Sequence, residues 1–549
     1  MTNHPSSRLR ILKRSAAARF RWVFAGVLFA LFLSSIAINP FSAQGAGATS
    51  HHPTLGPDGV ESQAIISQNK LKGTTSWMIS KEPRSGYIEG FAASNYAKVG
   101  DTVNIYVSTT APRFHVTAYR MGWYGGAGAH EVWQSKEISG KVQPRCPVTR
   151  GINMVSCDNW TRSLKMPITT TFFQGDYLLK LVGSTKQQSY VLLTIWNPSS
   201  TAAYLFMSRS LTEEGWNLFG GYSYYQGEGP CPAGSYSYPP CNRARVVSFD
   251  RPFADGNGSS DFLTNEYPLL RFMEQHGLDV AYVTDVTVND HPGILLRHRV
   301  LLSLGHDETW TYPERQGAQV ALSHGVNVAF MSAAAIVRHA RLQPSPLGPD
   351  REEVDYRDST EDPLNGKGNP LQVTGNTWSS PPTSWPTNGF IGEMYSGFTY
   401  PGVGAKPFIV WDPSAWIFKH TGLHRGSSIP GVIASDIDHL YPPMPSNIEV
   451  LGHSPLALSG TYTNQGEWNG YTYSDMTYFT DQKSKGGVFD SGTVNWINSL
   501  SPCPGASSSC PAELVGKITG NLLWLFGQGP AGRLDPSRAN WQHVIPAGS

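Results

Sequence analysis

Alternating polar and apolar positions dominate the chain between residues 76 and 198. A period of two is typical of strands with one buried face, and short strands joined by turns are typical of a β-sandwich. We therefore predict an all-β, immunoglobulin-like sandwich over 76–198. Its clearest strands are expected at 101–107, 114–120, 175–181 and 189–196.

Beyond residue 199 the pattern changes to short, uninterrupted apolar runs separated by helix-like stretches. Such runs are typical of strands buried on both faces, and strand–helix alternation predicts a parallel α/β sheet. The expected strands are 204–207, 279–283, 300–304, 326–331 and 487–490, and the expected helices are 269–276, 312–324 and 514–526. We predict an α/β domain over 199–549, with residues 345–400 as a long excursion over the sheet.

The N-terminal 48 residues have the pattern of an export signal. They hold six basic residues and no acid, followed by an apolar run over 22–38 and a small-residue tract that ends at Ala48. Either a signal peptide is cleaved after Ala48, or the run remains as a membrane anchor. Residues 49–75 are expected to be a linker. We therefore expect an extracytoplasmic protein, secreted or anchored to the membrane.

The six cysteines fall into three local pairs, and pairs this close suit disulfides formed in an oxidising compartment. Metal binding is the weaker alternative, since the sequence has no CxxC spacing. The formal net charge is +1 and the expected folded part has no basic run, so we expect no nucleic-acid partner. The predicted pairs are Cys146 with Cys157, Cys231 with Cys241, and Cys503 with Cys510.

The strongest candidate for chemistry is the segment Gly305-His306-Asp307-Glu308-Thr309-Trp310, directly after a predicted strand. Ligands of open α/β sheets bind beyond the carboxyl ends of the strands. The imidazole of His306 can shuttle protons, and Glu308 can act as a base or bind a hard metal. The structural alternative is that Asp307 caps the following helix.

Three further segments are weaker candidates. Trp216 and Asn217 begin an aromatic, glycine-containing stretch that could wall a pocket or simply pack over the core. Asp436, with Asp438, could be a strand-end acid or a turn residue. The third segment could position a substrate or fix a loop through a buried ion pair, and it comprises Phe249, Asp250 and Arg251.

Several motifs in one order resemble the N,N-dimethylformamidase beta (large) subunit family, over about residues 85–530. They are Gly86–Gly90, Ala118–Gly126, Asn217–Gly221, Phe249–Phe253, Gly305–Trp310, Gly486–Asp490 and Gly492-Thr493. The resemblance implies a β-sandwich followed by an α/β domain similar to class I glutamine amidotransferases and ThuA. It also implies hydrolysis of a C–N amide bond.

The family's namesake enzyme holds one iron bound by two tyrosines and a glutamate. The resemblance places the glutamate at Glu308, whereas the tyrosine positions hold Trp216 and Phe249, which cannot supply a phenolate. Either Tyr222, Tyr224 or Tyr225 takes over as a ligand, or the metal has been lost.

Three functions remain open from the sequence. The first is a metal-assisted amide hydrolase in which Glu308 binds iron and His306 or Asp436 handles protons. The second is a non-catalytic envelope protein that binds a glycan or a partner through an aromatic cleft. The third is a metal-free hydrolase of an envelope substrate that uses His306 with a neighbouring acid. The expected ligand is a small-molecule amide or an envelope component.

Overall fold

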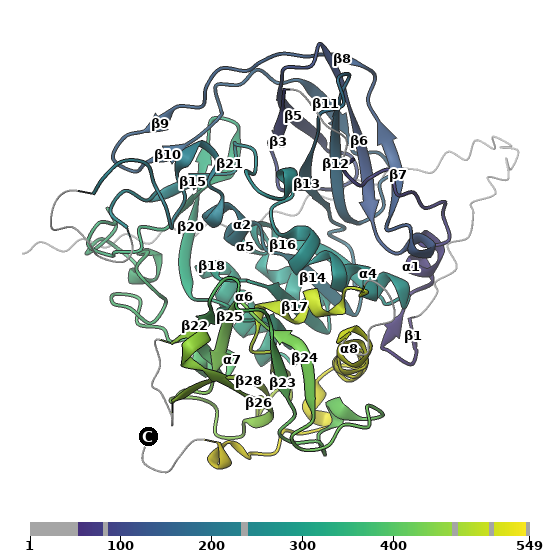
Figure 1. Cartoon of the computed structure of the whole chain (residues 1–549), viewed down its shortest axis with the longest axis vertical. Helices are drawn as coiled ribbons and strands as arrows, with labels where there is room; N and C mark the ends of the chain where they lie inside the picture. The colour runs from purple at the N-terminus through teal and green to yellow at the C-terminus, as the bar shows by residue number, and fades with distance from the viewer. Residues whose placement is uncertain (1–52, 81–85, 232–239, 464–469, 504–509, 545–549) are drawn as a thin grey trace, which may run out of the picture. The chain divides into compact units, whose positions relative to one another are not determined.

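Two sheets, antiparallel except for the short parallel pairing of β4 with β13, pack face to face in the N-terminal half of the computed structural model (Figure 1). The structure describes residues 53–80, 86–231, 240–463, 470–503 and 510–544. One sheet has the order β11-β5-β3, and the other β4-β13-β12-β6-β7 with β8 beside β6. Their strands are β3 (Ile88–Ala92), β4 (Tyr96–Ala97), β5 (Thr102–Thr109), β6 (Arg113–Met121), β7 (Ala129–Gln134), β8 (Ile138–Ser139), β11 (Leu164–Pro167), β12 (Gly175–Gly183) and β13 (Gln188–Ile195).

The alternating side chains of the two sheets meet in one apolar core. Ile105 of β5, Val116 of β6 and Leu179 of β12 are fully buried there. All four predicted strands are present, each within a few residues of its expected bounds. The sandwich is therefore confirmed as a packed pair of sheets, because the period of two places one apolar face of each sheet against the other.

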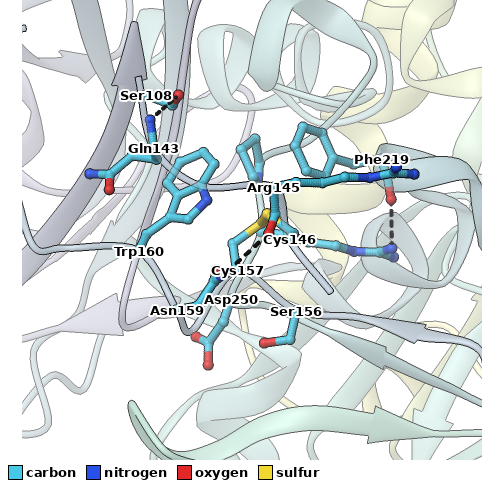
Figure 2. Close-up of a disulfide and its surroundings, with 12 residues drawn as sticks. Ser108, Gln143, Arg145, Cys146, Ser156, Cys157, Asn159, Trp160, Phe219 and Asp250 are labelled. Atoms are coloured by element: carbon cyan, nitrogen blue, oxygen red, sulfur yellow. Dashed lines mark hydrogen bonds between the residues drawn. A yellow bond between two sulfur atoms is a disulfide. The ribbon is translucent and has the colours of Figure 1, made fainter. Parts of the chain in front are cut away.

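Disulfides join all three predicted cysteine pairs. Figure 2 shows the first pair, in which the Cys157 amide donates a hydrogen bond of 2.6 Å to the carbonyl of Asp250. Trp160 and Phe219 belong to the same apolar cluster as this pair. The disulfide therefore fixes a loop of the sandwich against the first segments of the α/β part. The three bonds indicate an oxidising, extracytoplasmic environment.

A seven-stranded sheet forms the centre of the α/β part, with the order β16-β14-β17-β19-β29-β28-β26. The first five strands are parallel, and the last two pairings are antiparallel. The strands are β14 (Tyr204–Ser208), β16 (Val280–Thr284), β17 (Val300–Gly305), β19 (Asn327–Ser332), β26 (Glu449–Ala457), β28 (Tyr471–Thr480) and β29 (Gly487–Asp490).

Helices cover both faces of this sheet, as uninterrupted apolar strands require. Phe206 of β14 packs in the same core as α4 and α8, whereas its neighbour Met207 packs in the core of α5 and α6. The helices are α4 (Tyr267–Gln275), α5 (Asp285–Asp290), α6 (Tyr312–Ser323) and α8 (Ala512–Phe526). The predicted parallel α/β sheet is confirmed.

The predicted excursion over 345–400 contains two strands that the sequence did not indicate, β21 (Gly348–Val354) and β22 (Met394–Thr399). They belong to the small sheets β15-β21-β20-β18 and β25-β22-β27. The other strands of these sheets are β15 (Val246–Ser248), β18 (Thr309–Thr311), β20 (Arg338–Ser345), β25 (Asp436–His439) and β27 (Thr461–Thr463).

No helix within the described ranges is long and apolar enough to cross a bilayer. The predicted export signal over 1–48 lies outside the described residues. Contacts group residues 51–549 into one unit that contains both the sandwich and the α/β part.

Candidate active site

The predicted chemical segment lies at the carboxyl end of strand β17. Gly305 ends that strand with a φ of +56°, and a Cβ there would approach the Cβ of Asn265 to 2.7 Å. Only glycine fits such a turn without strain. The alternative that Asp307 caps the next helix is wrong, because Thr311 caps α6 through a capping box with Glu314.

Asp307 and Glu308 point to different environments. Asp307 is fully buried and accepts a hydrogen bond of 2.7 Å from the Ser303 hydroxyl. Burial raises the pKa of Asp307 to about 7. Glu308 instead reaches the residues of the cleft described below. The two adjacent acids, in the turn between β17 and β18, therefore have different surroundings and different roles.

Donors surround the Glu308 carboxylate. Arg338 Nε lies 3.1 Å from Oε1, Trp216 Nε1 donates to Oε2 over 3.0 Å, and the Tyr225 hydroxyl also donates to Oε2. Burial alone would raise the pKa of Glu308, but the charge of Arg338, then His306 and the Tyr225 hydrogen bond outweigh it and lower that pKa. Glu308 is therefore a fixed anion.

His306 lies between two carboxylates. Its Nε2 atom is 3.6 Å from Glu308 Oε2 and 3.7 Å from Asp436 Oδ2. Asp436 is the first residue of β25, so the pair joins two elements far apart in sequence. Burial, with Glu308 nearby and His306 opposing, raises the pKa of Asp436. These contacts bring together all three residues predicted to be catalytic.

A cleft of about 370 Å³ opens beside these residues. His306 and Asp436 line it together with Trp216, the last residue of α2 (Ser210–Trp216). Trp216 is 43% exposed, and its ring stacks on Tyr225 at 3.6 Å between ring centroids. Stacking on Tyr225 fixes the indole and leaves it at the cleft surface.

The other predicted substrate-binding residues divide into two groups. Asn217 lines the cleft, where its side chain contacts Glu214 and the Pro252 carbonyl. Arg251 is buried and donates to the carbonyls of Asn217, Phe219 and Tyr222, so it holds the loop that carries the aromatic stack. Asp250 binds Arg351 at 2.8 Å, and Phe249 packs against Leu211. The described residues that line the cleft do not include Phe249, Asp250 or Arg251.

Sequence reasoning missed two arginines of the site. Arg338 begins β20, which pairs in parallel with β18 and so lies beside Glu308. The Arg357 guanidinium lies over the Tyr225 ring, 4.4 Å from its centroid. Neither position carries a motif, because both contacts come from strand pairing and loop packing. Of the three alternative tyrosines, Tyr225 is the one that contacts Glu308, whereas Tyr224 is buried and donates to the Glu353 carbonyl.

The donor set at Glu308 does not fit iron held by two tyrosines and a glutamate. The site supplies one phenol, and the second ring is an indole whose N–H donates to the carboxylate instead of binding a metal. Burial raises the pKa of Tyr225 well above its usual value, which disfavours the phenolate. Phe249 packs with Leu211 and Val286 and offers no ligand atom. In the described parts of the chain, no group of three His, Cys, Asp or Glu side chains could hold a metal ion.

Comparison with protein families gives one match over residues 115–510, to the C-terminal region of N,N-dimethylformamidase beta subunit-like proteins. A comparison with curated proteins found no match. Among solved structures, the chain is similar to a Paenibacillus sp. cycloisomaltooligosaccharide glucanotransferase complexed with cycloisomaltoheptaose. That likeness has 12% identity and a TM-score of 0.14 over 26% of this chain and 19% of the other, and it carries no argument.

Proposed function

Because the chain belongs to the N,N-dimethylformamidase beta subunit-like family, we propose that it is an exported hydrolase of C–N amide bonds that works by acid–base chemistry at His306 and Asp436. The observation that carries this proposal is the position of His306 Nε2 between two carboxylates at the cleft surface. An imidazole beside a carboxylate is suited to taking a proton and returning it.

The reaction needs water and the amide alone. His306 takes a proton from water as the water oxygen attacks the carbonyl carbon, which forms the new C–O bond. The same proton then passes to the amide nitrogen as the C–N bond breaks, so that a carboxylic acid and an amine leave. Asp436 and Glu308 stabilise the imidazolium that forms between these two steps.

Positive charge beside His306 comes from Arg209. This side chain lines the cleft and donates to the His306 carbonyl over 3.1 Å. It is almost fully buried, and its Nε and Nη2 atoms lie 3.5 Å from Glu266 and 3.6 Å from Glu213. In the proposed reaction Arg209 is therefore a positioning residue that holds the backbone at His306.

The test is amine release from a panel of N-formyl and N-acetyl amides by the purified protein. His306→Asn is expected to lower kcat at least about 100-fold, in the range of general acid–base catalysis. His115→Asn is the matched control, because His115 forms a similar pair with Glu137 in the sandwich at 3.0 Å. Equal rates for the two variants would contradict the proposal.

A second candidate function is a binding protein without catalysis. The exposed indole of Trp216 at the cleft surface favours it. In that case Trp216→Ala would abolish ligand binding, and no amide in the panel would be hydrolysed. The finer fold expectations, an immunoglobulin-like sandwich and a ThuA-like α/β domain, remain part of the same proposal, as do secretion or anchoring through residues 22–38.

A further inference from the structure

A row of aromatic rings begins directly beside Asp436. In the sheet β25-β22-β27, Asp436 is the direct partner of Phe398, and Phe398 is the direct partner of Tyr462. Direct partners on neighbouring strands point to the same face of a sheet. The two rings therefore lie on the face from which Asp436 reaches His306, one and two strands further from the cleft.

These rings form a continuous surface, which we call the aromatic platform. Phe398 stacks on Tyr462 with 5.2 Å between ring centroids, and Tyr400 meets Phe398 edge-on at 5.8 Å. Tyr400 is 43% exposed and Tyr462 is 44% exposed. Adjacent exposed aromatic rings with ordered geometry are typical of a surface that receives a ligand.

The charged side chains of the adjoining cleft indicate which net charge a ligand can carry. Its described lining includes four acids, of which Asp255 and Asp261 are exposed, and a single cationic side chain, Arg209, which is almost fully buried. Anionic ligands are therefore disfavoured. A neutral ring with hydroxyl groups fits better, because its C–H face can pack on aromatic rings while its hydroxyls donate to the carboxylates. The other two acids of the lining are Glu213 and Asp436.

We propose that the aromatic platform, formed by Phe398, Tyr400 and Tyr462, is a substrate subsite for a pyranose ring of a neutral glycan. The N-acyl group of a neighbouring sugar then lies at His306 and Asp436, so the substrate class is an N-acylated amino sugar within an oligosaccharide. This inference rests on the proposed amide hydrolysis and names its substrate.

The probe is tetra-N-acetylchitotetraose, with cellotetraose as the ligand that lacks the amide. The purified protein is expected to bind the first tetramer in a calorimetric titration and to release acetate from it. Tyr462→Ala is expected to raise the Kd at least about fivefold, since it removes one stacked ring. Tyr462→Phe keeps the ring and should stay within about twofold, as should Tyr87→Ala, which removes a tyrosine of the sandwich that is 39% exposed.

The outcomes separate this inference from the proposed function. If Tyr462→Ala binds the tetramer as well as the wild type does, or the wild type binds none, the subsite is overturned, and hydrolysis of small amides still decides the proposed function. If the tetramer binds through Tyr462 but no amide is hydrolysed in the tetramer or in the small panel, the proposed function and the substrate assignment both fail. If both tetramers bind equally well and neither is hydrolysed, the N-acyl assignment fails.

Discussion

The Tyr225 hydroxyl donates its hydrogen to the same Glu308 oxygen that accepts from the Trp216 indole. The two rings stack in parallel, so both donors reach the carboxylate from one side. Arg338 occupies the other oxygen. Glu308 is thereby held as an anion 3.6 Å from His306, and it orients the imidazole without sharing its work of proton transfer.

Removing one donor tests this arrangement. Tyr225→Phe keeps the ring stacked on Trp216 but deletes a hydrogen bond to a charged group, which is worth about 1.5–3 kcal/mol. We expect the free energy of unfolding to fall by about that amount in urea titrations. The control is Tyr222→Phe, which removes the hydroxyl of a nearby tyrosine. If both variants have the same free energy of unfolding, the hydrogen bond from Tyr225 to Glu308 contributes nothing to stability.

Asp436 contributes to the acid side of the pH–rate profile, together with His306 as the general base. The pKa of Asp436 is raised above 3.8 by burial and by Glu308, against the opposing His306. We therefore expect amide hydrolysis to fall as pH decreases, both because the base becomes protonated and because a protonated Asp436 no longer stabilises the imidazolium. Asp436→Asn should lower kcat and shift this limb without removing it. Asp58→Asn, which breaks a contact with His276, is the control and should leave the profile unchanged.

A second histidine–carboxylate group lies in the sheet away from the cleft and serves stability. Asp475 is buried and accepts from His439 over 2.6 Å and from His453 over 2.7 Å. Burial opposes ionisation, but the two histidines outweigh it and hold the pKa of Asp475 well below its usual value. The ionised Asp475 therefore contributes to the free energy of unfolding above pH about 3.9, the pKa of an aspartate in the unfolded chain. This contribution is lost as pH falls through the lower pKa of Asp475 in the folded protein.

Asp475→Asn is expected to lower the free energy of unfolding at pH 7 by about 1.5–3 kcal/mol, because the single amide oxygen cannot accept hydrogen bonds from both histidines as the carboxylate does. The difference from the wild type should shrink on acidification below pH about 4. Urea titrations at several pH values measure both effects. A loss that stays constant down to pH 3 would contradict the assigned charges.

Asp176 of β12 is expected to affect stability with the opposite pH dependence to Asp475. Its carboxyl accepts from Thr194 over 2.6 Å and from Ser208 over 3.2 Å, and burial raises its pKa to about 7. Asp176 contributes fully to the free energy of unfolding below pH about 3.9, the pKa of an aspartate in the unfolded chain. This contribution is lost as pH rises through the pKa of Asp176 in the folded protein. Relative to wild type, Asp176→Asn should gain stability between pH 4 and 8, by up to about 4 kcal/mol. A difference independent of pH would refute this.

The central sheet and the sandwich follow from local pattern, whereas much of the site does not. The apolar run 300–304 predicted both a strand and the position of His306 beyond its end, because parallel strands present their carboxyl ends at one edge. Asp436 was a candidate, but its contact with His306 depends on how a separate small sheet packs. Local periodicity contains no information about that packing.

The contacts of the aromatic and basic residues of the site could not be predicted from the sequence either. The sequence offered three tyrosines as possible neighbours of Glu308, and only loop conformation distinguishes Tyr225 from Tyr224. Arg251 was a candidate for substrate binding, yet its five donors serve buried carbonyls and Glu214. The local sequence does not distinguish an Asp-Arg pair whose arginine faces a cleft from one whose arginine holds a loop.

The most direct test of the account is amide hydrolysis by the purified protein after exhaustive dialysis against a chelator, with iron measured by mass spectrometry on the same sample. The account predicts amine release that persists without stoichiometric iron and that is lost in His306→Asn. Near-stoichiometric iron that disappears in Glu308→Ala together with the activity would contradict it, because the reaction would then depend on a metal held by Glu308.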